Sequence, residues 1–318
     1  MPLSPVRLTL LLIIARIAAT TAVAQTPFTL LSARDKLIKN YPEIIIYQAD
    51  SANVIARRDV QYCCIGRRVL ACDIFVPQRA DTSALPLAII VHGGGWLSGD
   101  KSMDNEIAKT LVHNGFAAMC VDYRKSGEAL YPAAVQDIRC AIRWARLNAG
   151  KYHFDPRRFA LIGSSAGGQM AALIGAVNGD YDSFDNDIYA GVSSHVACVI
   201  DIDGVLSFIH PDSGEGCDKP GKPSSATLWF GCTAADNPEL WNEASATHHV
   251  SAQSADFLII RGCQPRFTAG FCEMADSLRK YGRRAEIRTL DDAPHTFWLF
   301  EPWAEQTIEY ILSWLREL

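Results

Sequence analysis

The chain has 318 residues, of which 49% are hydrophobic and 20% are charged, and its formal net charge at pH 7 is −5. A chain of this length and apolar content can bury a sizeable core, and α/β domains of this size routinely fold as one unit, so we expect a single domain over residues 25–318. The charge leaves no basic stripe, which argues against nucleic acid and anionic membranes as partners.

The first 24 residues have the pattern of an export signal. Arg7 precedes the short apolar run Leu8–Ala15, and Ala22–Ala24 supplies small residues for a signal peptidase. Arg16 interrupts a run that is already far shorter than the roughly 20 apolar residues of a membrane-spanning helix. We therefore predict a signal peptide over residues 1–24 and a periplasmic or secreted mature protein, with no membrane attachment after cleavage.

Strand-like and helix-like segments then alternate, which is the pattern of a mostly parallel sheet covered by helices on both faces. The stretches Ile55–Tyr62 and Val69–Phe75 alternate in polarity and are expected as antiparallel strands at the start of the sheet. Short apolar runs that end at polar residues or glycine suit buried parallel strands. These runs are Leu87–Val91, Phe116–Val121, Arg158–Ile162, Val196–Ile202, Phe257–Ile260 and Ala285–Leu290.

Helix-length segments separate these strands. In one of them, Val135, Ile138 and Ile142 are spaced three or four apart, as on a helix that packs one face against a sheet. The predicted helices are Asn105–Asn114, Ala133–Asn148, Ala166–Ala176, Met274–Tyr281 and Ala304–Leu315. The stretch 205–238 breaks the rhythm with crowded proline and glycine residues. Long loops in compact domains are usually functional or disordered, so we predict a lid-like insertion over the functional site.

Ten cysteines are many for a cytosolic enzyme, and this number fits an oxidising compartment. Cys120 and Cys198 lie in apolar runs and are expected as buried free thiols, which behave as small hydrophobic residues. No cysteine or histidine cluster has the spacing of a zinc site, so no metal is predicted. The candidate disulfides in loops are Cys217 with Cys232, and Cys263 with Cys272.

A G-x-S-x-G motif, Gly163-Ser164-Ser165-Ala166-Gly167, lies between a predicted strand and a predicted helix. A tight turn at this place needs small flanking residues and raises the serine hydroxyl above the carboxyl edge of the sheet. The helix start also favours developing negative charge. A glycine- and serine-rich helix N-cap would give the same letters, so Ser165 is a candidate nucleophile that needs further support.

That support comes from His92-Gly93-Gly94-Gly95-Trp96, which directly follows the predicted strand Leu87–Val91. Successive glycines let the backbone approach a ligand closely, and their N–H groups can point at an oxyanion. A flexible turn is the alternative, but a glycine run after one strand and a serine turn after a later one indicate acyl-transfer chemistry. His295 follows the last predicted strand, where a loop can bring its imidazole back over Ser165 as the general base.

The acid that would orient His295 is missing from its usual place. In proteins with this order of motifs, a carboxylate follows the strand before the histidine strand, yet Gly262-Cys263-Gln264-Pro265 follows Phe257–Arg261. Glu273 could instead be a solvated helix residue, and Asp292 could brace the histidine loop. The candidates in order of preference are Glu273, then Asp203 or Asp201 at the end of Val196–Ile202, and then Asp292.

Several motifs together resemble the bacterial carboxylesterase and carbohydrate-esterase branch of the α/β-hydrolases, which is related to the hormone-sensitive-lipase group and to feruloyl and acetyl esterases. They are the two motifs above with Gly99-Asp100-Lys101, Asp122-Tyr123-Arg124 and Asp155-Pro156-Arg157-Arg158. The resemblance runs from about Asp59 to the C-terminus and is most specific over Ile90–Ala172. It implies an α/β-hydrolase fold with a mostly parallel eight-stranded sheet, Ser165 as nucleophile and His295 as base. It also implies an oxyanion hole formed by backbone amides of Gly94, Gly95 or Trp96 and of Ala166.

The segments Pro265-Arg266-Phe267 and Pro294-His295-Thr296-Phe297 resemble a subgroup of exported bacterial esterases associated with plant polysaccharides such as pectin. This resemblance suggests that Arg266 pairs with a uronate carboxylate and that sugar rings stack on tryptophans. The alternative is that Arg266 forms a structural ion pair and that the tryptophans belong to the core. The tryptophans in question are Trp96, Trp298 and Trp303.

The resulting expectation is an acyl-enzyme mechanism on a small-molecule or carbohydrate ester, without metal or organic cofactor. Two alternatives stay open. An amidase or peptidase would use the same triad. A catalytically silent binding protein would explain the absence of the acid from its usual position.

Overall fold

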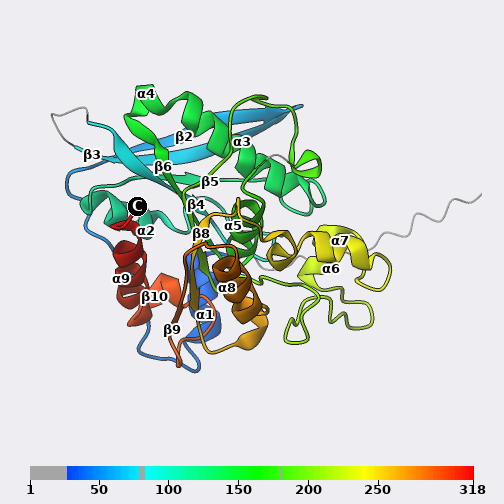
Figure 1. The fold of residues 1–318 in the computed structure, drawn as a ribbon. Coiled ribbons are helices and arrows are strands. Elements are labelled where there is room, and N and C mark those ends of the chain that lie inside the picture. The colour runs from blue at the N-terminus through cyan, green and yellow to red at the C-terminus, as the bar shows by residue number, and fades with distance from the viewer. Residues whose placement is uncertain (1–26, 79–82, 180) are drawn as a thin grey trace, which may run out of the picture.

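The computed structural model describes residues 27–78, 83–179 and 181–318, so the predicted signal peptide lies outside the described residues. An eight-stranded sheet with the order β2-β3-β5-β4-β6-β7-β8-β9 forms its centre (Figure 1). β2 pairs with β3 and β3 with β5 in antiparallel fashion, and the remaining neighbours are parallel. The expected mostly parallel sheet with antiparallel strands at its start is confirmed. The structure therefore has the architecture of the α/β-hydrolase fold.

All eight predicted strands are present, with ends that differ by a few residues. β6 is the most extended beyond its prediction, because it begins at Phe154 rather than Arg158. A separate antiparallel pair joins β1 and β10. The strands are β1 Ile45–Ile46, β2 Val54–Ile65, β3 Arg68–Pro77, β4 Leu85–Val91, β5 Ala117–Val121, β6 Phe154–Ser164, β7 Cys198–Ile202, β8 Asp256–Arg261, β9 Ala285–Thr289 and β10 Phe300–Glu301.

The five predicted helices are also present, and the structure adds four short helices that the sequence pattern did not reveal. α3, α5 and α8 bury their apolar side chains against one face of the sheet, whereas α2 and α9 cover the other face. The helices are α1 Leu30–Leu37, α2 Asn105–His113, α3 Ala133–Leu147, α4 Ala149–Tyr152, α5 Ala166–Val177, α6 Ser225–Phe230, α7 Pro238–Glu243, α8 Phe271–Lys280 and α9 Trp303–Leu315. Among the described residues, none of these helices is long and apolar enough to cross a membrane.

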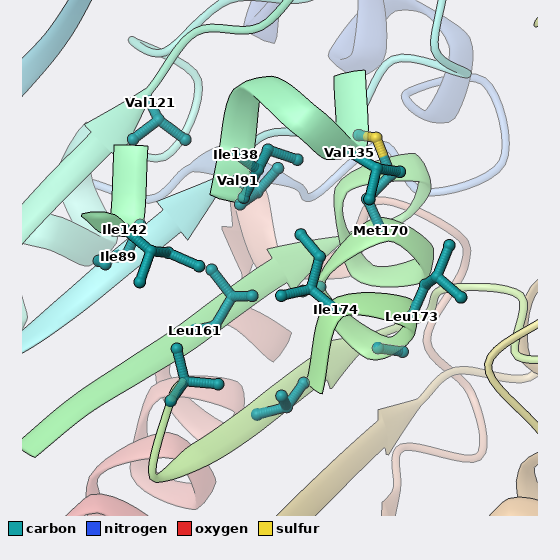
Figure 2. Packing of buried hydrophobic residues seen from close by; sticks show 14 of the residues in the cluster. Ile89, Val91, Val121, Val135, Ile138, Ile142, Leu161, Met170, Leu173 and Ile174 are labelled. Atoms are coloured by element: carbon teal, nitrogen blue, oxygen red, sulfur yellow. The ribbon is translucent and has the colours of Figure 1, made fainter. Parts of the chain in front are cut away.

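The core between the sheet and α3 and α5 fixes the position of the serine turn. Figure 2 shows Ile89 and Leu161 on the central strands packed beneath Ile142 of α3 and Ile174 of α5. β4 and β6 are adjacent and parallel in register, with Val91 opposite Gly163. The two motifs that follow these strands therefore begin side by side at one edge of the sheet.

The ten cysteines are all free thiols, and none of the residues that the structure describes forms the disulfides expected for Cys217 with Cys232 or for Cys263 with Cys272. Cys120 and Cys198 are buried in the core beneath α2 and α9, as predicted. Burial raises the pKa of the Cys198 thiol to about 12, so it stays protonated at neutral pH.

Candidate active site

The turn between β6 and α5 holds Ser165 in an unusual backbone conformation, with φ of 53° and ψ of −121°. Non-glycine residues rarely adopt positive φ, and such conformations concentrate at functional sites. The turn is possible only with small flanking residues, because a Cβ on Gly163 would lie 2.1 Å from the carbonyl oxygen of Gly167. This packing is the physical reason for the glycines of the G-x-S-x-G motif.

Ser165, His295 and Asp203 form a continuous hydrogen-bonded chain. The Oγ of Ser165 lies 2.9 Å from Nε2 of His295, and Nδ1 of His295 lies 2.7 Å from Oδ2 of Asp203. The serine and histidine come from the turn after β6 and the loop after β9, which are 130 residues apart in sequence. The structure therefore brings together the predicted nucleophile and base, with a carboxylate that orients the imidazole.

The prediction of Glu273 as the orienting acid is wrong. Glu273 lies on α8 with its side chain 60% exposed, and its Oε1 is 3.3 Å from Nε2 of His210. Of the other candidates, Asp292 accepts a hydrogen bond from the indole of Trp303. It braces the histidine loop, which was the alternative role predicted for it. Asp203, a second-choice candidate, is the carboxylate that contacts His295.

Asp203 follows β7, and the packing at the end of β8 explains why the acid is not found there. Gly262, the first residue after β8, lies directly under the histidine loop, and a Cβ at this position would come within 2.6 Å of the carbonyl oxygen of Ala293. The Gly262 N–H instead donates to Oδ1 of Asp203 at 2.9 Å. The end of β8 thus orients a carboxylate supplied by the neighbouring strand. Asp203 is fully buried, so the hydrogen bonds from Gly262 and His295 compensate for its lost hydration.

Asp201, two residues before Asp203, is equally buried, but its side chain faces the backbone of Gly168 and Gly204 rather than His295. Its Oδ1 would lie 2.3 Å from a Cβ placed on Gly168 or on Gly204, so it is packed against the backbone of both glycines. Burial, and secondarily the charge of Asp203, raises the pKa of Asp201 well above the usual range. Asp201 is therefore a neutral carboxylic acid that supports the serine turn from below, outside hydrogen-bond reach of the imidazole among the described contacts.

The glycine motif after β4 lies beside Ser165. A Cβ on Gly93 would be 3.0 Å from the Cβ of Ser165, and one on Gly94 would be 2.0 Å from the carbonyl oxygen of Ser98. Gly94 has φ of 126°, Gly95 of 60° and Trp96 of 59°. Within the described residues, the backbone N–H groups of Gly94, Gly95, Trp96 and Ala166 donate no hydrogen bond, so they are available to an incoming oxyanion.

The tryptophans that the sequence suggested as sugar-stacking platforms belong to the core, so that hypothesis is wrong. Trp96 is 4% exposed, donates to Gln169 and stacks on Trp229. Trp298 and Trp303 are 1% and 7% exposed. The indole of Trp96 thus anchors the glycine loop to α5 through Gln169 and to α6 through Trp229.

A cavity of about 610 Å³ opens above Ser165 and His295. Its walls come from segments far apart in the sequence: α1, the glycine loop, residues 214–225 and residues 264–267. Part of the predicted lid 205–238 therefore lines the cavity, although residues Ser225–Phe230 within it form α6 rather than a loop. α1 is a wall that the sequence pattern did not predict.

Arg266 and Phe267 lie in this wall next to the imidazole. The Phe267 ring stacks on the His295 ring with centroids 3.5 Å apart and planes 11° apart, and the Arg266 guanidinium carbon lies 4.5 Å from the centroid of the Phe267 ring. Arg266 also pairs with Glu215 at 3.2 Å. Burial raises the pKa of Glu215, and the charge of Arg266 opposes this shift. Arg266 thus forms an ion pair with Glu215 within the protein, which is the alternative that the sequence left open for it.

Within the described residues, no group of three or more histidine, cysteine or carboxylate side chains could hold a metal ion. The side chains and amides around Ser165 can perform nucleophilic acyl transfer. They supply a serine hydroxyl, an imidazole within hydrogen-bond reach, a carboxylate behind the imidazole, and free amides beside the hydroxyl.

Comparison with known proteins places this site in a family. The BD-FAE family model matches residues 72–267, more than half of the chain. Esterase LipC of Mycobacterium tuberculosis is 26% identical over 191 residues, which are 60% of this chain and 47% of LipC. Carboxylesterase NlhH of Mycobacterium tuberculosis is 37% identical over 91 residues, or 28% of each chain. The matched region thus spans less than half of the length of these curated relatives.

Among solved structures, a truncated carbohydrate esterase from gut microbiota superposes with a TM-score of 0.70 and 22% sequence identity, over 85% of this chain and 99% of that one. Est2 of Thermogutta terrifontis, an esterase solved with butyrate bound, gives a TM-score of 0.67 and 21% identity over 84% of this chain and 94% of its own. At these identities the likeness establishes a shared fold.

Proposed function

Because the chain belongs to the BD-FAE family, we propose that it is a serine hydrolase that cleaves carboxylic esters through an acyl-enzyme. The observation that carries the proposal is the hydrogen-bonded chain from Ser165 through His295 to Asp203, which opens into a cavity beside free backbone amides. Esterase names among the relatives support the same reaction class.

In the first half of the reaction, Nε2 of His295 removes the proton of the Ser165 hydroxyl as the oxygen attacks the ester carbonyl. The negative charge that develops on the carbonyl oxygen is stabilised by the amides of Gly94, Gly95 or Trp96 and of Ala166. His295 then gives its proton to the leaving alcohol, and the acyl group stays on Ser165.

In the second half, His295 takes a proton from water, and the resulting hydroxide attacks the acyl-enzyme. The acid product leaves when Ser165 recovers its proton. Asp203 keeps Nδ1 of His295 protonated, so that Nε2 faces the serine, and it stabilises the imidazolium that forms in both halves.

The reaction class is tested by labelling the full chain with a fluorophosphonate probe and by turnover of p-nitrophenyl acetate. We expect one covalent adduct, located at Ser165 by peptide mass spectrometry, and no adduct or turnover with Ser165→Ala, which should lose about six orders of magnitude in kcat. An intact protein that neither labels nor turns over esters would favour the binding-protein alternative.

We further propose that the ester belongs to a carbohydrate, as in a plant polysaccharide. The cavity has a volume of about 610 Å³, and its walls carry charged and polar side chains between apolar ones, so they can meet both the hydroxyl groups and the ring faces of a sugar. The carbohydrate esterase among the structural neighbours supports this substrate class. Comparing kcat/KM for an acetylated oligosaccharide and for p-nitrophenyl acetate tests it, and a preference for the aryl ester would count against it.

Export is also proposed, on the basis of the leader-like residues 1–24. Expression of the full chain in a bacterial host, followed by mass measurement of the periplasmic or secreted protein, should give a mature chain that starts near Gln25. Retention of the intact N-terminus in the cytoplasm would contradict this proposal.

A further inference from the structure

Three exposed lysines line the catalytic cavity: Lys36 on the last turn of α1, and Lys219 and Lys222 in the loop before α6. We propose that these lysines, named here the lysine rim, form an anion-binding subsite. This subsite selects esters in which the sugar residues next to the scissile bond carry carboxylates. This proposal rests on the proposed ester hydrolysis and further specifies that the substrate is negatively charged.

The loop holds two of these lysines side by side. Lys219 and Lys222 exchange both backbone hydrogen bonds, at 3.1 Å and 2.8 Å, across the turn formed by Pro220 and Gly221. Gly221 has φ of 69°, which suits the position after proline in a type II turn. Residues paired in this way project their side chains from the same face, and like charges there are destabilising. A bound anion would relieve that repulsion.

The lysine rim lacks internal counter-charges. Within the described residues, no carboxylate lies within 4 Å of any of the three ammonium groups. The nearby acids have other partners, because Asp203 contacts the imidazole and Glu215 pairs with Arg266. Asp218, next to Lys219 in sequence, accepts hydrogen bonds from the N-terminus of α6. The cavity therefore carries unneutralised positive charge in a chain whose net charge is −5.

The chemistry of lysine defines the ligand. An ammonium group is a flexible point charge without a required contact plane, so lysines on separate segments suit several carboxylates along a chain. Arg266, the planar group suited to one bidentate carboxylate, is already paired with Glu215. Positive charges that line a cleft also raise the local concentration of anionic ligands. An acidic oligosaccharide ester fits both features.

The test compares an acetylated uronic acid trisaccharide with the neutral acetylated hexose trisaccharide of the same linkage. We expect the wild type to prefer the acidic ester in kcat/KM. The preference should fall by about threefold for each lysine removed in Lys36→Gln and in the double variant Lys219→Gln/Lys222→Gln. It should also fall when NaCl is raised from about 50 mM to about 500 mM, because salt screens exposed charges.

The matched control removes two lysines that do not line the cavity. Lys39 follows α1, and Lys280 ends α8. The double variant Lys39→Gln/Lys280→Gln has the same net charge as the double rim variant, and its acidic-to-neutral ratio should stay within twofold of wild type. The subsite is overturned if the wild type hydrolyses the acidic and neutral trisaccharides with equal kcat/KM. It is also overturned if the ratio of the two kcat/KM values falls equally in both double variants.

Binding gives a readout that does not depend on turnover. Titration of Ser165→Ala protein with the de-esterified uronic acid trisaccharide should give a Kd that weakens about tenfold when Lys219 and Lys222 are replaced. Equal affinity for the acidic and neutral trisaccharides would overturn the subsite. Charge-dependent binding without hydrolysis of any ester by the wild type would instead overturn the proposed function alone.

Discussion

The floor of the cavity is built at the ends of sheet strands, whereas its rim is built from segments that the sheet does not fix. The floor consists of Ser165, His295 and Asp203 with the glycine loop 93–96, and each of these groups directly follows a strand or lies on the loop after one. The rim consists of α1 and residues 214–225 and 264–267. The floor is buried or half-buried, and the lysines of the rim are exposed.

The floor and the rim have different functions, which are catalysis and substrate selection. Groups that act on the reacting atoms must be held within a fraction of an ångström, which strand ends and buried hydrogen bonds provide. Groups that sort substrates can lie on loops and short helices, where changes cost the fold little. Changes in the floor should therefore reduce kcat by orders of magnitude, and changes in the rim should alter selectivity by small factors.

Replacing the buried acid of the floor should give the largest effect after loss of the serine. Asp203→Asn should lower kcat by about 10⁴, because an amide would favour the wrong tautomer of His295 and would not stabilise its imidazolium. Glu273→Gln changes the same functional group on the exposed face of α8, and its kcat should stay within twofold of wild type. Steady-state kinetics on p-nitrophenyl acetate compares the two variants. Similar losses in both would undo the assignment of Asp203.

The glycine loop gives the next largest effect. Gly94→Ala should lower kcat by about two to three orders of magnitude, because a Cβ there would collide with the carbonyl oxygen of Ser98 and displace the amides that face the oxyanion. Gly150→Ala on α4 is the control, since a Cβ at this position meets no atom within 4 Å. Burst kinetics separates a slow acylation step from a loss of active protein. A variant that folds and acylates at the wild-type rate would remove this loop from catalysis.

Phe267 joins the rim to the floor, so its replacement should have an intermediate effect. Phe267→Leu keeps an apolar side chain but removes the ring that stacks on His295, and it should lower kcat about five- to tenfold with little change in KM. Phe267→Tyr keeps the ring and should remain close to wild type. The midpoint of thermal unfolding, measured for both variants, shows whether the fold is intact. Equal activity of the leucine and tyrosine variants would show that the stack does not position the base.

Most residues of the floor could be predicted from the sequence, because the turns that hold them require particular residue types. A tight turn after a buried strand needs glycines at fixed places, so Ser165 and the glycine loop leave a local pattern. The acid leaves no such pattern, because any strand end near the imidazole can supply it. The Gly262 position explains the choice of Asp203 only once the histidine loop is seen to pack on that glycine.

The rim was not predictable in the same way. α1 is too short and too weakly amphipathic for its pattern to reveal it, and its contact with the cavity depends on tertiary packing. The sequence left open whether the tryptophans stack on sugars or belong to the core, because the sequence pattern of an indole is the same in both cases. The pairing of Lys219 with Lys222 could have been inferred from the Pro220-Gly221 turn signal, but its position at the cavity could not.

Asp201 should give the smallest effect on activity, because it lies outside the floor, although it is only two residues from Asp203. Its burial among glycine backbones raises its pKa well above the usual range, so the folded protein holds it as a neutral acid. Asp201→Asn replaces one neutral group by another of the same shape, and kcat should stay within twofold of wild type.

The free energy of unfolding of Asp201→Asn should change with pH in a direction that can be stated in advance. In wild type, the unfolded chain releases the Asp201 proton above its ordinary pKa of about 4, whereas the folded chain retains it, so this residue lowers the free energy of unfolding progressively as pH rises above that value. Asparagine removes this penalty. Urea unfolding should therefore show that Asp201→Asn gains stability relative to wild type between pH 5 and pH 8, by up to about 1.4 kcal/mol per pH unit. A variant that loses stability as pH rises relative to wild type would mean that Asp201 is ionised in the fold. Two charged carboxylates would then lie behind the serine turn, and Asp203 could no longer be treated as the sole source of negative charge near the imidazole.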